Sequence, residues 1–144
     1  IKNKKTEIVI IVSTTTNKSN HLSNVLKKGG CVIRTKYQDK IEEIYQCADF
    51  YLFPTLDFKA AIHLPLSILE AIACNIKVFC TDYGNIKENL LNYDNIVIYN
   101  DINEIKSKLN NSFSVKQNNK LNVQEFDWYN ILNKLRLLYS HYLL

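Results

Sequence analysis

Three stretches of the chain decide its fold: ADFYLFPT at residues 48–55, LPLSILEAIACN at residues 64–75 and VFCTDYG at residues 78–84. The first contains the apolar run 50–53, which predicts a buried β-strand. Pro54 ends this strand because proline has no N–H group to donate to a sheet. The second stretch has helical spacing, and the third is again typical of a strand. Together they predict a strand, a helix and a second strand.

The predicted helix covers residues 65–74 and carries one acidic residue among apolar ones. Pro65 suits its first turn, where the missing N–H costs nothing. Leucine, isoleucine and alanine recur around most of the circumference, so we expect the helix to be buried on most sides. Glu70 then needs a partner, because an unpaired buried carboxylate is costly. Asn75 follows the helix and tolerates the left-handed backbone of a helix-ending turn.

Strands and helices alternate along the rest of the chain. Further strands are predicted at residues 7–12, 31–35, 77–81 and 95–99, and further helices at residues 19–28, 39–47, 85–92, 101–109 and 123–144. Ser19 and Asp101 are expected to cap two helices, with Glu104 as the capping-box partner of Asp101. The polar segment 110–122 is expected to be a mobile loop. The alternation predicts an α/β fold with a mostly parallel sheet and helices on both faces.

Composition sets limits on the class of protein. A chain of 144 residues that is 47% hydrophobic can bury one core, so we expect a single domain over residues 1–144. The net charge of +4 is mild and dispersed, which indicates an ordinary soluble surface or a weak attraction to nucleoside diphosphates or to an anionic membrane, and no nucleic-acid partner is expected. No apolar run approaches the roughly 20 residues of a membrane span, and no signal peptide is visible. Four cysteines without C-x-x-C spacing are expected to be reduced core thiols of a cytosolic protein, with no metal: Cys31, Cys47, Cys74 and Cys80.

The order of these motifs resembles the donor-binding, C-terminal domain of GT-B-fold retaining glycosyltransferases, the glycosyl transferases group 1 (family 4 type). The pattern of that family runs approximately A-D-x-x-x-x-P-S, then L-P-L-x-x-L-E-A-M-A-C-G-x-P-V, then T-x-x-G-G-x-x-E. The sequence FDW at residues 126–128 is similar to the F-S-W that starts the C-terminal helix of the same enzymes. The matched positions are Ala48, Asp49, Pro54, Leu64, Pro65, Leu66, Leu69, Glu70, Ala71, Ala73, Cys74, Val78, Thr81, Gly84 and Glu88. The resemblance extends over nearly the whole chain and implies a Rossmann-like domain.

The resemblance implies a retaining, metal-independent, hexosyltransferase-like enzyme of polysaccharide or glycolipid synthesis. Such an enzyme moves a sugar from a nucleoside-diphosphate sugar to a glycan or lipid-linked acceptor, and the donor is a substrate, so no cofactor is expected. Glu70 matches the glutamate that binds the ribose, although it could instead cap a neighbouring loop. The helix that follows His63 would offer unpaired N–H groups to the diphosphate. The other residues expected at the donor are His63, Leu64, Pro65, Leu66, Ser67, Thr81, Gly84, Asn85 and Thr35.

The chain departs from the family where a glutamate contacts the transferred sugar. That glutamate stands eight positions before the ribose-binding one, where this chain has Ile62, which cannot accept a hydrogen bond. The connection from Pro54 to Pro65 is longer than usual, and Asp57 within it could enter the same space. Asp57 is therefore the candidate catalytic carboxylate. His63 and Asn85 replace family glycines; His63 could reach a phosphate or simply fill the surface, and Asn85 could bind a phosphate or cap the next helix.

Two parts of the complete family are expected to lie outside this chain. One is an opening strand and helix whose Arg and Lys clamp the donor diphosphate, and the other is the N-terminal acceptor-binding domain, here an expected partner. We therefore expect a segment of a longer enzyme that is inactive by itself. The full enzyme is expected in the cytoplasm, where it could associate peripherally with the inner face of the membrane.

A second hypothesis belongs to a different functional class. A non-catalytic relative could keep the fold as an interaction or assembly module and lose sugar binding. This hypothesis predicts that side chains pack where the sugar would lie, namely those of Phe58, Ile62 and His63.

Overall fold

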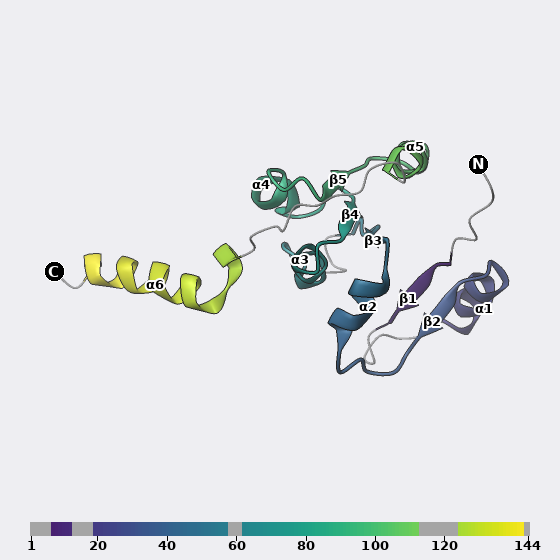
Figure 1. Ribbon diagram of the computed structural model, residues 1–144, viewed down its shortest axis with the longest axis horizontal. Helices are drawn as coiled ribbons and strands as arrows, with labels where there is room; N and C mark the ends of the chain where they lie inside the picture. Colours follow the sequence, from purple (N-terminus) through teal and green to yellow (C-terminus); the bar gives the residue numbers. More distant parts are fainter. Residues whose placement is uncertain (1–6, 13–18, 58–61, 113–123, 143–144) are drawn as a thin grey trace. The chain divides into compact units, whose positions relative to one another are not determined.

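The computed structural model describes residues 7–12, 19–57, 62–112 and 124–142 (Figure 1). It divides into two compact units, Ile1–Lys40 and Ile41–Leu144, and each is described by itself. Every strand pair in the described residues is parallel, and helices connect the paired strands. The predicted α/β fold class with a parallel sheet is confirmed.

The first unit is a strand, a helix and a second strand. Strands β1 (Val9–Ile11) and β2 (Val32–Arg34) pair with Val9 opposite Val32, and helix α1 (Asn20–Lys28) connects them. Ser19 caps α1 as predicted, because its hydroxyl accepts a hydrogen bond from the Leu22 amide at 3.3 Å. The chain leaves the helix through Gly30 at φ 86°, a left-handed conformation that glycine adopts without strain.

The second unit contains a three-stranded sheet in the order β3, β4, β5. Its elements follow one another as α2 (Ile41–Cys47), β3 (Phe50–Phe53), α3 (Leu66–Ala73), β4 (Lys77–Cys80), α4 (Ile86–Leu90), β5 (Ile96–Ile98), α5 (Ile102–Ser112), the 3-10 turn η1 (Gln124–Phe126) and α6 (Trp128–Tyr142). Phe50 pairs with Lys77, and Val78 with Ile96. The predicted strands and helices are confirmed in existence and order, with shifts of a few residues at their ends. The exception is the helix predicted over residues 123–144, which begins only at Trp128 and is preceded by the separate turn η1.

Helices cover both faces of this sheet because successive side chains on a strand point to opposite faces. Val78 and Cys80 belong to one core cluster with residues of α2, α3 and α4, such as Tyr45, Ile72 and Ile86. On the other face, Phe79 packs in a second cluster with Tyr99 and with Ile105 and Leu109 of α5. Figure 1 shows α3 and α5 on opposite sides of the three strands, as these two clusters require.

Two predictions of burial are wrong. The strand β3 is not fully buried: Leu52 is 48% exposed, because β3 is an edge of the three-stranded sheet and pairs there only with β4. Helix α3 buries one face rather than most of its surface. Ile68, Ala71 and Ile72 are buried, whereas Leu66 and Glu70 are exposed.

Several predicted helix ends are modified by the structure. Pro65 is the N-cap of α3 rather than its first helical residue. Asn75 adopts the predicted left-handed conformation at φ 60°. Asp101 caps α5 by accepting from the Glu104 amide at 2.9 Å, but the Glu104 carboxylate accepts from the amide of Asn100 rather than that of Asp101. Helix α5 reaches Ser112, so part of the predicted loop 110–122 is helical, and residues 113–122 lie outside the described residues.

Candidate functional site

The predicted donor site begins where β3 and β4 end, at the carboxyl edge of the sheet. Thr81 follows β4, and its hydroxyl donates a hydrogen bond to the carbonyl oxygen of Thr55, which follows β3. The Thr81 amide also donates to the Phe53 carbonyl at 3.3 Å. Thr81 is buried, so its hydroxyl serves to hold the two loops together. Ligands of open α/β sheets bind at this edge.

A second backbone contact joins the segment before α3 to the loop after β4. The Asn85 amide donates to the His63 carbonyl at 2.9 Å. Gly84 lies so close to His63 that a Cβ on the glycine would stand 2.2 Å from the His63 carbonyl oxygen. Gly84 also has a φ of 54°, which is left-handed. Glycine at position 84 therefore allows the His63 segment to approach the loop and sets where α3 begins.

Helix α3 begins beside this contact without a side chain that caps it. Its N-cap is Pro65, with φ −66° and ψ 124°, and no side-chain hydrogen bond is made by this cap. The Ile68 amide donates to the Pro65 carbonyl at 3.1 Å. Leu66 is 62% exposed and Ser67 is half-buried. The positive end of the helix dipole is thus directed to the carboxyl edge of the sheet.

Glu70 lies one turn further along α3 and has a partner on α2. The phenol of Tyr45 donates a hydrogen bond to Glu70 Oε2 at 3.1 Å. Burial raises the pKa of Tyr45 well above its ordinary value, and the nearby Tyr51 and Glu70 raise it further. The phenol therefore keeps its proton and remains a donor. Glu70 itself is exposed, so solvent and ligands can reach its carboxylate.

Tyr51 and Cys74 complete the surroundings of this carboxylate. The ring of Tyr51 packs edge-on against that of Tyr45 with centroids 5.6 Å apart. Burial raises the pKa of Tyr51, and a hydrogen bond with Ser67 opposes this shift. Burial also raises the pKa of the Cys74 thiol, with smaller effects of Glu42 and Glu70. Because their pKa values are raised, the two phenols and the thiol near this carboxylate keep their protons at neutral pH.

Comparison with known families assigns this architecture. A model of the family described as glycosyl transferases group 1 matches residues 1–114. The chain belongs to this family. The match includes the predicted donor-site residues and confirms the resemblance to a C-terminal-type domain of a GT-B glycosyltransferase. No curated protein matches the chain, and no solved structure does.

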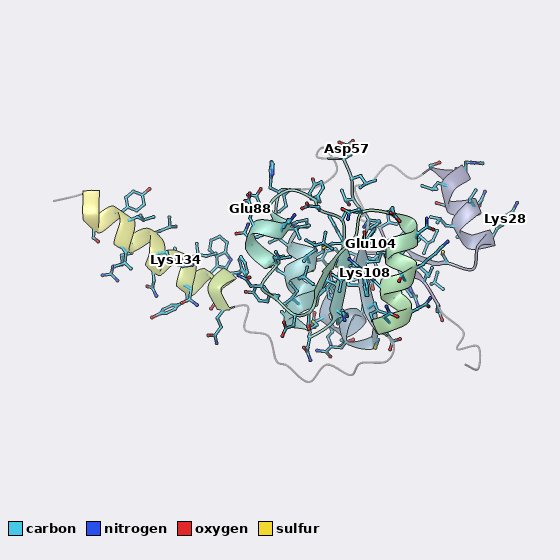
Figure 2. The ribbon with its side chains drawn as sticks, turned by 90° about the horizontal axis from the view of Figure 1, so that it is seen from above. Lys28, Asp57, Glu88, Glu104, Lys108 and Lys134 are labelled. Atoms are coloured by element: carbon cyan, nitrogen blue, oxygen red, sulfur yellow. The ribbon has the colours of Figure 1, made fainter. Side chains whose placement is uncertain are left out.

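Within this glycosyltransferase domain, the predicted site residues fall into several groups. The segment His63–Leu64–Pro65–Leu66–Ser67 meets Gly84 and Asn85 through the contacts of His63, and Glu70 follows on the same helix. Thr81 lies at the end of β4 and bonds instead to Thr55 and Phe53, which belong to the end of β3 and its loop. Asp57 is exposed on the loop after β3, as Figure 2 shows. Thr35 follows β2, is exposed and belongs to the first unit, whereas the other predicted site residues belong to the second.

The departures from the family pattern also have places in the structure. Ile62 is 61% exposed, so the expectation that it packs into the sugar site of an interaction module is wrong for this residue. Phe58 lies outside the described residues. Asn85 is the N-cap of α4, but its side chain makes no capping hydrogen bond; its carbonyl instead accepts from the Asn89 side-chain amide at 2.8 Å.

The cysteines and the other groups able to bind metals are dispersed. All four cysteines are free, and only Cys80 is buried; Cys47 is exposed, so the prediction that all four are core thiols is wrong. In the described part of the chain, His, Cys, Asp and Glu side chains do not gather in a group of three or more that could hold a metal ion. Helices of the described residues are also too short or too polar to cross a membrane.

Tyr45 is the residue at this site that sequence reasoning missed. The requirement for a partner of Glu70 was visible in the sequence, and so was a helix at residues 39–47 that precedes β3. Their pairing was not visible, because 25 positions separate the two residues and the contact depends on how α2 packs against α3. The role of the Thr55 carbonyl could not be predicted from the sequence, because every residue has a backbone carbonyl.

Proposed function

We propose that this chain provides the donor site of a retaining, metal-independent glycosyltransferase. The donor would be a nucleoside-diphosphate sugar, and the acceptor a glycan or lipid-linked sugar of cell-surface polysaccharide or glycolipid synthesis. Membership of the family implies that a nucleotide sugar is bound. The single observation that carries the proposal for this site is the exposed Glu70 carboxylate, held by Tyr45 beside the start of α3.

The ribose is the part of the donor that suits Glu70. A ribose presents two neighbouring hydroxyl donors, and an ionised carboxylate accepts through two oxygens with about four lone-pair positions. Tyr45 occupies one of these positions on Oε2. The remaining positions suffice for both hydroxyls. A hydrogen bond to a charged acceptor contributes about 1.5–3 kcal/mol, so the diol contributes substantially to affinity.

The diphosphate suits the start of α3. Helix N-termini favour anions because their first amides lack intrahelical acceptors and the dipole is positive there. The cap by Pro65 adds no competing side-chain acceptor. His63 lies directly before this turn and could add a donor to a phosphate. The arrangement would stabilise the departing diphosphate without a metal, by position and electrostatics.

Asp57 is proposed to face the transferred sugar in place of the family glutamate. Its loop follows β3, at the same edge of the sheet as Thr81 and the start of α3. A carboxylate there would accept from sugar hydroxyls or stabilise positive charge that develops at the anomeric carbon. A lipid-linked acceptor would place the complete enzyme at the cytoplasmic face of a membrane.

Calorimetric titration with UDP-, GDP- and ADP-sugars tests the proposal. All motifs matched in these 144 residues belong to the donor-binding part of the family, so we expect binding without sugar transfer from this chain alone. Glu70→Gln should weaken binding of the accepted nucleotide about tenfold or more, whereas Glu88→Gln on α4 is the matched control and should not. Asp57→Asn should weaken the binding of the nucleotide sugar but leave the binding of the free nucleotide unchanged. No binding of any of the three donors, in this chain or in a longer one, would refute the proposal.

A further inference from the structure

The loop between β4 and α4 is fixed at several points to the edge of the sheet where the donor is proposed to bind. Thr81 bonds to the end of β3, and the Asn85 amide bonds to the His63 carbonyl at 2.9 Å. Between these two points the buried ring of Tyr83 packs edge-on against that of Phe53, with centroids 5.8 Å apart. The backbone of this loop therefore holds its exposed side chains at a defined place beside the segment that starts α3.

An ion pair joins this loop to the first turn of α4. Lys87 Nζ lies 3.7 Å from Asp82 Oδ2, and the two side chains are 60% and 47% exposed. Ile86, beside the lysine, is fully buried and anchors the helix. A separation of 3.7 Å is longer than a hydrogen bond, and exposed ion pairs contribute little to stability. Lys87 can therefore exchange Asp82 for another anion at little cost.

Lys108 shows how a lysine near the same edge is held by the fold instead. Its ammonium donates to the carbonyl of Ile98, at the end of β5, at 2.6 Å and pairs with Glu104 at 2.7 Å. These short contacts commit Lys108 to joining α5 to the sheet. The pair formed by Lys87 is longer and more exposed, so Lys87 is the better placed of the two to bind a ligand.

We propose that Lys87 binds the diphosphate of the donor, and that Asp82 holds this lysine in place in the free protein. The inference rests on the proposed function, which assigns the diphosphate to the start of α3. Lysine serves phosphates as a compact charge with rotatable donors on a flexible stem. It also offsets the repulsion between phosphates and the nearby carboxylates. Positions 82 and 87 are not among those that match the family pattern, so the resemblance assigns neither residue a role.

The two members of the pair should change the affinity in opposite directions. Lys87→Gln removes the cation that the phosphates would gain, and it should weaken the binding of UDP, GDP or ADP, whichever the chain accepts, up to about fivefold. Asp82→Asn removes an anion that competes for the lysine and repels the phosphates, and it should strengthen the same binding about twofold. A purely structural ion pair predicts instead that both changes act alike, because either one breaks the pair.

Isothermal titration calorimetry with UDP, GDP and ADP measures these changes, and each variant has a control of matched charge. Lys77→Gln, at the start of β4 and therefore at the opposite end of that strand from Thr81, removes the same charge as Lys87→Gln. Glu88→Gln, at the residue labelled on α4 in Figure 2, changes the net charge as Asp82→Asn does but leaves the pair intact. Both controls should bind nearly as wild type does. Far-ultraviolet circular dichroism shows whether the variants keep the fold.

The outcomes separate this inference from the proposed function. An affinity that Lys87→Gln leaves unchanged, or that Asp82→Asn fails to raise, would overturn the inference, and so would an equal loss in Lys77→Gln. If Glu70→Gln weakens binding and Lys87→Gln does not, the role of Lys87 is refuted while the donor site stands. A wild-type protein that binds none of the three nucleotides, in this chain or in a longer one, would refute both.

Discussion

The phenol of Tyr45 donates a hydrogen bond to Glu70 Oε2 across 3.1 Å and thereby joins helix α2 to helix α3 at the proposed ribose carboxylate. The donor is almost fully buried and the acceptor is exposed. The bond therefore restricts the rotamers of a glutamate that would otherwise be mobile in solvent. A carboxylate held in one orientation loses less conformational freedom when it accepts hydrogen bonds from a ligand.

Tyr45→Phe removes this hydrogen bond while keeping the ring and its packing against Tyr51. We expect stability to fall by about 1 kcal/mol and nucleotide affinity to fall about fivefold, because an unrestrained glutamate must be ordered on binding. Titration with a ribonucleotide and its 2′-deoxy analogue shows whether Tyr45 positions Glu70 for the ribose or only stabilises the fold. A positioning role predicts that the preference for the ribonucleotide shrinks in the variant, and an unchanged preference would leave Tyr45 a structural residue only. Tyr129→Phe on α6 is the control.

Gly84 is predicted to tolerate no side chain. Gly84→Ala would place a Cβ 2.2 Å from the His63 carbonyl oxygen, and this neighbour is backbone that cannot turn away. Gly30→Ala is the matched control, since Gly30 also has a positive φ but nothing lies within 4 Å of its added Cβ. The left-handed conformation alone costs about 1–2 kcal/mol.

Urea denaturation of both variants should therefore show a clearly larger loss for Gly84→Ala than for Gly30→Ala. Gly84→Ala should also weaken donor binding, because it displaces the segment that starts α3. An equal loss of unfolding free energy in the two variants would mean that the His63 segment moves freely, contrary to the packing described.

Local chemistry and tertiary packing explain which features could be predicted from the sequence. The left-handed Asn75 and the capping Ser19 were predictable, because each depends on its own residue type and its immediate neighbours. The exposure of Leu52 was not, since an apolar run cannot reveal that its strand lies at a sheet edge. The burial of α3 was overestimated for the same reason. Leu66 and Leu69 have the spacing of buried residues, yet only the arrangement of α2, α3 and the sheet decides which side is covered.

The four cysteines should differ strongly in reactivity. Burial, with a smaller effect of Asp82, raises the pKa of the Cys80 thiol to about 12, so very little thiolate forms at neutral pH. Cys47 is exposed. Under native conditions, iodoacetamide should label Cys47 first and leave Cys80 unlabelled until the protein unfolds, as peptide mass spectrometry can show. Labelling of Cys80 at the rate of Cys47 in the folded protein would contradict the packing of β4 between its two helical layers.

Glu104 should give a defined part of the pH dependence of stability. Its carboxylate pairs with Lys108 at 2.7 Å and accepts from the Asn100 amide at 2.7 Å, and Figure 2 shows the two labelled side chains together on α5. The hydrogen bond with Lys108, followed by that with Asn100, lowers the pKa of Glu104. A lowered pKa in the folded state means that the stabilisation is complete above the ordinary value of about 4.3 and is lost as the pH falls through the lowered value.

Urea denaturation between pH 7 and pH 3 should accordingly show wild type more stable than Glu104→Gln near neutrality, with the difference shrinking in acid. Glu88→Gln on α4 removes the same charge without touching the ion pair with Lys108, and its difference from wild type should depend less on pH. High salt should reduce the effect of Glu104, because the pair is partly exposed and screened. A difference for Glu104→Gln that stays constant down to pH 3 would show that the neutral acid makes the same contacts, and the ion pair would then contribute nothing to the fold.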